Sequence, residues 1–303
     1  MNGYLDALLG FIGFGCYQIP LRFSKVKGLG FLSFIGIGIL LVDIIFIRQF
    51  LELWKDPVWF WGSIFSGMLW ALGQGFANLS LEELSLAKGS VLFNLNTLGN
   101  ILVGVFLFGE VTGFSKDLFL ILGTGLLLAG AIIVSVSEAD NHKEGNLKVG
   151  VLLALLAAIF WGIYFAPIKA LQISSQLKWP WLLKWEALNP TSNPSTLLVL
   201  SGLMMGAGIT AFFFGIHGLL KGGYREVGLG AGSAILWAFG MIFSLKAIDI
   251  LGLAKAIPII NSNVLLYAAW SFFVFKELPK SQIKRVVLGS ILVIGGILLL
   301  SLS

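Results

Sequence analysis

LWALGQGFANLSLEELSLAKGSVLFNLNTLGNILVGVFLFGE (69–110) recurs without a gap at 236–277, and this repetition constrains how the whole chain can fold. Fifteen of the 42 paired positions are identical at a constant offset of 167 residues. Shared apolar composition does not by itself bring polar residues into register, so the chain contains an internal duplication. The matched segments are LWALG (69–73) with LWAFG (236–240), LAK (86–88) with LAK (253–255), NLN (94–96) with NSN (261–263), and Glu110 with Glu277.

A second matched block lies nearer the start of each copy. GCYQIPLR (15–22) pairs with GIYFAPIK (162–169) at an offset of 147. The two offsets differ by 20 residues, which places an insertion in the second copy at about 172–194.

The composition assigns the chain to the membrane class. Of its 303 residues, 57% are hydrophobic and 12% are charged, about half the charged share of a soluble domain. A membrane-spanning helix needs about 20 mostly apolar residues. Ten stretches qualify: 4–23, 28–49, 57–80, 87–108, 114–136, 148–170, 195–219, 224–248, 252–275 and 283–302.

Five spans per copy is an odd number, so the second copy must enter the membrane in the opposite orientation. The expected fold is an all-α membrane protein with ten transmembrane helices in two inverted five-helix repeats. The repeats cover 1–137 and 148–303, and a polar hinge loop at 138–147 (EADNHKEGNL) joins them. Inverted repeats are typical of secondary transporters, because two equivalent halves can exchange conformations around a central site. A duplication can also simply produce a stable bundle.

Other features limit the partners and the location. The net charge of +5 comes from scattered Lys and Arg, which argues against nucleic acid. A modest excess of Lys and Arg in alternate loops favours both termini outside. WPWLLKWEAL (179–188) resembles an interfacial helix, either an anchor or a lid over the entrance. We expect a multi-pass protein of the plasma membrane, as a monomer or a homodimer, with no cofactor and no metal.

Polar residues repeated in both halves are the first candidates for a solute-binding site: Asn94, Asn96, Asn261 and Asn263. Carboxamides donate and accept hydrogen bonds, which suits the hydroxyls of a sugar. Two Asn at i and i+2 on a helix point about 200° apart, so one of each pair can face a cavity while the other bonds a neighbouring helix. Asn100 and Tyr267 share the faces of Asn96 and Asn263. All of these residues could instead be interhelical ties.

Spans 1 and 6 supply the second group of candidates. Pro20 and Pro167 are expected to kink or break these helices, next to Tyr17, Gln18 and Tyr164. Tyrosine can stack on a sugar ring and bond its hydroxyls. The further candidates, three possible stacking surfaces and two amides of span 3, are Trp70, Trp161, Trp237, Gln74 and Asn78.

Gln74 and Asn78 have no polar equivalents in the second half, where Met241 and Leu245 stand. This difference would allow a pseudo-symmetric cavity to bind an asymmetric molecule. Asp43 is the carboxylate expected deepest in the membrane and the candidate for proton coupling, whereas Asp6 is expected at a solvated span end. Both proton symport and facilitated diffusion are compatible with the sequence.

Five further motifs complete the evidence from the sequence: CYQIPLRFSKVKG (16–28), SGMLWALGQ (66–74), FGE (108–110), GIYFAPIKA (162–170) and FKE (275–277). On these motifs the chain resembles the drug/metabolite transporter superfamily, and within it the glucose/ribose uptake permeases and the rhamnose–proton symporter. This resemblance implies ten short spans and transport of a neutral sugar, in some members with a proton. Two other interpretations remain: export of amino acids or amphipathic metabolites, and an intramembrane enzyme or structural subunit. An enzyme would need a nucleophile–base or metal constellation, and two His and one Cys supply none.

Overall fold

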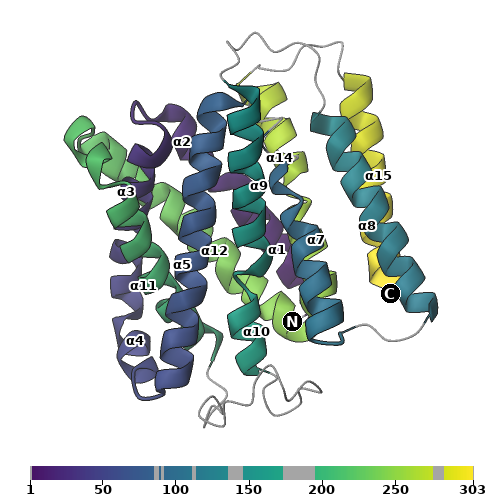
Figure 1. Cartoon of the computed structure of the whole chain (residues 1–303), viewed down its shortest axis with the longest axis horizontal. Helices are drawn as coiled ribbons and strands as arrows, with labels where there is room; N and C mark the ends of the chain where they lie inside the picture. The colour runs from purple at the N-terminus through teal and green to yellow at the C-terminus, as the bar shows by residue number, and fades with distance from the viewer. Residues whose placement is uncertain are drawn as a thin grey trace.

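The computed structural model describes residues 2–84, 89, 92–110, 114–135, 146–172, 195–275 and 283–302, and in these ranges the regular structure is helical. The long helices run roughly along one direction and form a single bundle (Figure 1). The expected interfacial insertion, most of the hinge loop, Lys88 and Glu277 lie outside the described residues.

The first half of the chain supplies the helices up to Ser135. They are α1 (Gly3–Cys16), α2 (Ile19–Phe23), α3 (Gly28–Asp43), η1 (Ile44–Phe46), α4 (Ile47–Leu53), α5 (Pro57–Glu83), α7 (Asn96–Leu102), a π-helical segment η2 (Val103–Leu107) and α8 (Phe114–Ser135).

The second half supplies the helices from Leu147 onwards. They are α9 (Leu147–Ile163), α10 (Ala166–Gln172), α11 (Thr196–Phe214), η5 (Ile216–Lys221), α12 (Tyr224–Leu251), α13 (Leu253–Asn261), α14 (Val264–Ala269), a π-helical segment η6 (Trp270–Val274) and α15 (Ile283–Leu302).

Local sequence explains where several of these helices begin. Asp56 precedes α5, and its Oδ1 accepts hydrogen bonds from the backbone N–H groups of Val58 (3.2 Å) and Trp59 (3.4 Å). A carboxylate at this position satisfies donors that the helix itself leaves free. Gly252 separates α12 from α13 with φ +79°, a left-handed conformation that glycine adopts without strain.

Five helical segments of the described residues are long and apolar enough to cross a membrane. They coincide with five of the expected spans and confirm the prediction of a helical membrane protein. The five segments are Gly3–Phe23, Gly28–Leu53, Lys148–Gln172, Thr196–Phe214 and Tyr224–Leu251.

Of the other five expected spans, one coincides with α5, and each of the remaining four contains a shorter apolar helix. The shorter ones are Asn96–Leu107, Leu118–Gly130, Leu253–Tyr267 and Val287–Gly296.

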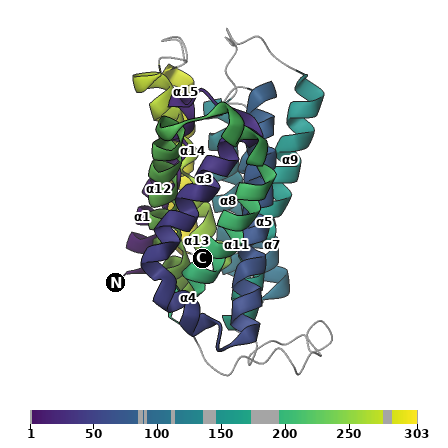
Figure 2. The same ribbon diagram turned by 90° about the vertical axis from the view of Figure 1, so that its left-hand side faces the viewer.

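Packing between the helices is close and follows a paired pattern. α1 packs against α12, and α5 packs against α9. α3 and α11 pack against each other; α3 also contacts α12, and α11 also contacts α5 (Figure 2). Glycines make this approach possible, since a Cβ on Gly13 of α1 would lie 2.4 Å from Cα of Gly240 in α12. α8 and α15 lie side by side at one edge of the bundle (Figure 1).

Candidate functional site

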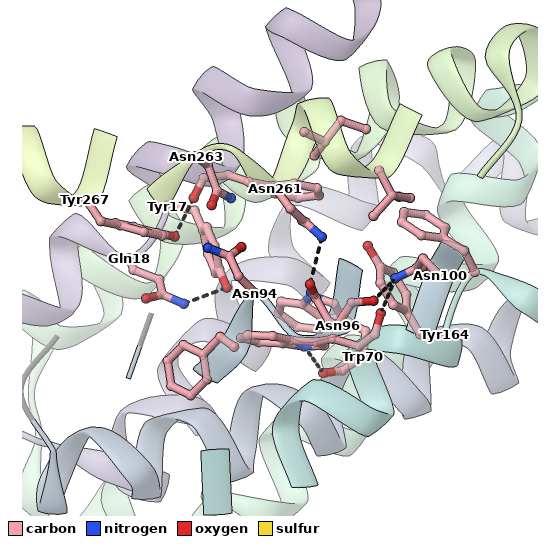
Figure 3. Close-up of a pocket in the computed structure, with 16 residues that line it drawn as sticks. Tyr17, Gln18, Trp70, Asn94, Asn96, Asn100, Tyr164, Asn261, Asn263 and Tyr267 are labelled. Atoms are coloured by element: carbon pink, nitrogen blue, oxygen red, sulfur yellow. Dashed lines mark hydrogen bonds between the residues drawn. The ribbon is translucent and has the colours of Figure 1, made fainter. Parts of the chain in front are cut away.

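A cavity of about 620 Å³, counted with its open mouth, lies between the helices of the two halves (Figure 3). It is lined by Phe14, Tyr17, Gln18, Trp70, Phe93, Asn94, Asn96, Asn100, Trp161, Tyr164, Phe165, Ile257, Ile260, Asn261, Asn263 and Tyr267.

Four interruptions of helix surround this cavity. The helical pattern breaks at 17–18 and 164–165, and again at 94–95 and 262–263. The first two breaks confirm the expected effect of Pro20 and Pro167, which sit in the first turns of α2 and α10. Broken backbone within a membrane is tolerated where it is buried in protein or lines a cavity. Each break places at least one side chain on the cavity wall.

The breaks change the expected geometry of the asparagines. Because the chain turns at 94–95 and at 262–263, the two Asn of each pair are not on one continuous helix. The 200° separation that a regular helix would impose therefore does not apply, and all four asparagines line the cavity. Two of the four are bonded to each other: Asn261 Nδ2 donates to Asn96 Oδ1 at 2.8 Å, and also to Thr97 Oγ1 at 3.0 Å.

Two further hydrogen bonds join the halves at the cavity wall. The Tyr267 hydroxyl donates to the backbone oxygen of Phe14 at 2.6 Å, and Asn100 Nδ2 donates to that of Trp161 at 3.0 Å. Phe14 and Trp161 are equivalent at the offset of 147, and Asn100 and Tyr267 at the offset of 167. A side chain of the second half therefore donates to a backbone oxygen of the first half, and the equivalent side chain of the first half donates to the equivalent backbone oxygen of the second.

The cavity wall is polar but uncharged among the described residues that form it. Asn, Gln and Tyr provide hydrogen-bonding groups, while Trp and Phe rings provide flat apolar surfaces. Two buried polar atoms on this wall, Asn94 Nδ2 and Asn100 Oδ1, have no hydrogen-bond partner within the described part of the chain. Buried polar atoms are normally paired, so these two are available to a bound polar molecule.

Most of the residues expected at a site converge on the cavity. Three of them lie behind its wall instead. Gln74 accepts a hydrogen bond of 2.7 Å from the Tyr17 hydroxyl and bonds Asn78, while the ring of Trp237 packs 4.3 Å from the ring of Trp70. The expected residues on the wall are Asn94, Asn96, Asn261, Asn263, Tyr17, Gln18, Tyr164, Trp70 and Trp161.

Two buried carboxylates lie away from the cavity wall. Asp43 is 2% exposed, and neither of its oxygens has a hydrogen-bond partner among the described residues. Asp6, which the sequence places at a solvated span end, is 1% exposed and equally unpartnered in that part of the chain. The expectation for Asp6 was wrong because the end of α12 packs against this end of α1, where a Cβ on Gly3 would lie 2.9 Å from the Leu251 side chain.

Sequence reasoning did not single out the apolar part of the wall: Phe14, Phe93, Phe165, Ile257 and Ile260. The internal match contained a signal for two of them. Phe14 is equivalent to the candidate Trp161, and Phe165 to the candidate Gln18, at the offset of 147. Phe93 and Ile260 are equivalent only to each other, at the offset of 167. Equivalents of cavity residues are themselves expected near a pseudo-symmetric cavity.

The apolar helices and the uncharged polar cavity between them define a multi-pass membrane protein with a candidate site for a small polar solute. The chain belongs to the family described as "Sugar transport protein", whose model matches residues 7–179. It is 24% identical over 279 residues to the glucose uptake protein of Bacillus subtilis (strain 168), covering 88% of this chain and 86% of that protein. It is 25% identical to an inferred sugar uptake protein of Lactiplantibacillus plantarum (strain ATCC BAA-793 / NCIMB 8826 / WCFS1), covering 82% and 80% of the two chains.

A solved crystal structure has a similar fold. It matches with a TM-score of 0.66 and 16% identity, over 99% of this chain and 96% of the other. The family and these relatives are named for sugar transport and uptake, which confirms the prediction of a transporter rather than an enzyme.

Proposed function

We propose that this protein carries a neutral monosaccharide across the plasma membrane into the cell by alternating access, as a member of the drug/metabolite transporter superfamily. The observation that carries the proposal is the cavity, with uncharged amides and phenols beside aromatic rings. Sugar rings stack on aromatic faces, and their hydroxyls both donate and accept hydrogen bonds. Uptake as the direction follows from the names of the relatives.

A neutral solute suits this wall better than an amino acid does. The ammonium and carboxylate groups of an amino acid would need charged or dipolar partners once they were desolvated. The described residues of the wall include no Asp, Glu, Lys or Arg. An amino-acid exporter is therefore the less suitable interpretation.

Alternating access needs two exchangeable halves, and several features support ten spans in two inverted repeats. The contact of α1 with α12 has a counterpart in that of α9 with α5, and the contact of α1 with α14 in that of α9 with α7. The π-helical segments Val103–Leu107 and Trp270–Val274 are equivalent at the offset of 167. The proposed halves are 1–137 and 148–303, joined by the hinge at 138–147.

Within this scheme, the bond between Asn261 and Asn96 holds one side of the cavity together. Opening that side would separate the two amides, and the equivalent asparagines, Asn94 and Asn263, would then be the pair that approaches. The unpartnered Asn94 Nδ2 is consistent with such an exchange.

Uptake by purified protein in liposomes tests the proposal directly. Radiolabelled glucose, ribose, rhamnose, a polyol and several amino acids would be compared, with and without an inward proton gradient. We expect saturable uptake of at least one sugar and none of the amino acids. Asn94→Ala should lower that uptake at least about tenfold, whereas Asn2→Ala, the same change outside the cavity, should not. Saturable amino-acid uptake without sugar uptake would reject the proposal.

A further inference from the structure

The hydrogen bonds behind Tyr17 form one continuous chain. Asn78 Nδ2 donates to the backbone oxygen of Gly28 at 3.2 Å, and Gln74 Nε2 donates to Asn78 Oδ1 at 2.7 Å. The Tyr17 hydroxyl then donates to Gln74 Oε1 at 2.7 Å. Gln74 and Asn78 are one turn apart on α5, with 0% and 1% of their surface exposed. The chain therefore connects a buried backbone carbonyl to a phenol on the cavity wall.

The backbone carbonyl fixes the direction of every bond in this chain. A carbonyl oxygen can only accept, so the group of Asn78 that faces Gly28 must be its NH₂. The side-chain oxygen of Asn78 then faces Gln74, so Gln74 must donate to it with its NH₂ group. The side-chain oxygen of Gln74 therefore faces Tyr17. The hydroxyl of Tyr17 has a single hydrogen, and it donates this hydrogen to the Gln74 oxygen. Reversing any amide would set two like groups against each other in a buried place.

The consequence appears at the cavity. Since the hydrogen of the Tyr17 hydroxyl is committed to Gln74, the phenol oxygen can only accept bonds from the cavity side. One such bond already comes from Gln18 Nε2 at 2.8 Å (Figure 3). A solute hydroxyl that contacts this oxygen must therefore act as the donor.

The equivalent tyrosine in the second half is not constrained in this way. Tyr164 matches Tyr17 at the offset of 147, but Met241 and Leu245 occupy the positions that match Gln74 and Asn78. Both are buried and neither can take part in a chain of hydrogen bonds. The Ser66 hydroxyl donates a hydrogen bond to the backbone oxygen of Tyr164. Within the described part of the chain, the Tyr164 hydroxyl itself remains free to donate or accept.

We propose that Gln74 and Asn78 are positioning residues that make Tyr17 an obligate hydrogen-bond acceptor, so that the carrier selects a sugar whose hydroxyl donates to Tyr17 at one ring position. This inference rests on the proposed function, because it requires the sugar to occupy this cavity. Two buried residues that do not line the cavity thereby determine whether the cavity accepts a donor or an acceptor at this point.

Fluorinated sugars test the polarity of the contact, because fluorine replaces a hydroxyl in size but cannot donate. Monodeoxyfluoro analogues of glucose would compete with radiolabelled glucose for uptake, one ring position at a time. At one position, the wild-type protein should bind the fluoro analogue about fivefold more weakly than glucose, the value of one neutral hydrogen bond. Gln74→Met frees the phenol hydrogen, so the preference at that position should fall to about twofold or less.

Three variants separate this polarity effect from a structural one. Asn78→Leu releases Gln74 and should reduce the same preference, and it serves where Gln74→Met fails to reach the membrane. Tyr17→Phe should abolish that preference. Met241→Leu, a change of similar volume at the equivalent position of α12, should leave it at the wild-type value.

The outcomes are distinct. An unchanged fluoro preference in Gln74→Met and Asn78→Leu, with glucose still taken up, would overturn the inference and leave the proposed function standing. A wild-type protein without a hydroxyl preference at any ring position would also overturn it. A wild-type protein that shows no saturable uptake of any sugar would overturn the proposed function, and the inference with it.

Discussion

The side chain of Asn261 donates a hydrogen bond of 2.8 Å to the side-chain oxygen of Asn96, and this bond links the two halves of the chain at the cavity wall. The donor comes from the end of α13 and the acceptor from the start of α7. The two residues are 165 positions apart, and both line the cavity (Figure 3).

Asn261→Ala is expected to lower sugar uptake about tenfold without changing the amount of protein in the membrane. The change removes the bonds to Asn96 and Thr97 together with a cavity amide, and one interhelical hydrogen bond is worth up to about 1.7 kcal/mol. Initial rates in liposomes of equal protein content measure this effect. Thr97→Val removes one of the two acceptors and should cost less than threefold; equal losses in both variants would assign the effect to packing.

A buried ion pair connects α10 with the segment that follows the π-helical η2. Lys169 Nζ lies 3.5 Å from Glu110 Oε1, and both side chains are about one-tenth exposed (11% and 10%). The other oxygen of Glu110 accepts a hydrogen bond of 2.8 Å from the backbone N–H of Ala254 at the start of α13. One carboxylate therefore ties three helical segments together.

Lys169→Met and Glu110→Gln should each lower the unfolding temperature of the detergent-solubilised protein. Removing one partner leaves the other as a buried charge without its counter-charge, which costs up to about 3–5 kcal/mol. The double variant should lose less than the sum of the two single losses, because neither charge then remains unpaired. Strictly additive losses in thermal unfolding would show that the two side chains act independently.

Gly67→Ala should destabilise the protein strongly, and Gly228→Ala should not. A Cβ on Gly67 of α5 would lie 2.1 Å from the backbone oxygen of Leu203 in α11, so the two helices would have to separate. A Cβ on Gly228 of α12 meets nothing within 4 Å, and alanine is the better helix former. Thermal unfolding and the yield of folded protein measure the difference. Equal stability of the two variants would contradict the close approach of α5 and α11.

Asp43→Asn tests whether uptake is coupled to protons through this carboxylate. A buried charge without a partner is costly, so a change in its protonation can bias one conformation over another. If Asp43 couples proton and sugar, the variant should lose the stimulation of uptake by an inward proton gradient and keep gradient-free exchange. Asp6→Asn, a change at an equally buried carboxylate, is the matched control and should keep the stimulation. If only Asp6→Asn lost the stimulation by the proton gradient, the proton-coupling role would be assigned to Asp6 instead.

Much of the site followed from the repetition in the sequence. NLN at 94–96 and NSN at 261–263 were matched across the repeat, and all four asparagines line the cavity. Tyr17 and Tyr164 were matched beside Pro20 and Pro167, and both tyrosines stand at helix breaks on the wall. The reason is that polar groups and prolines are costly within a membrane, so their positions are informative by themselves.

The apolar part of the wall could not be predicted from hydropathy. Phe14 and Trp237 are both buried aromatic residues, but Phe14 lines the cavity and Trp237 packs behind Trp70. In a membrane protein the side chains that face lipid are as apolar as those that face the core, so periodicity does not show how a helix is rotated.

The residues alone therefore determined the membrane class, the duplication and the small set of amides and phenols that a polar solute could meet. The tertiary structure decided that Gln74 and Asn78 support Tyr17 from behind, that Glu110 meets Lys169, and that Asp6 is enclosed. The division has a physical cause. The cost of placing a polar group in hydrocarbon depends on the residue type, so it can be read from the sequence. Hydrogen-bond direction and helix rotation depend on which helices meet, and only the packing of the folded chain determines that.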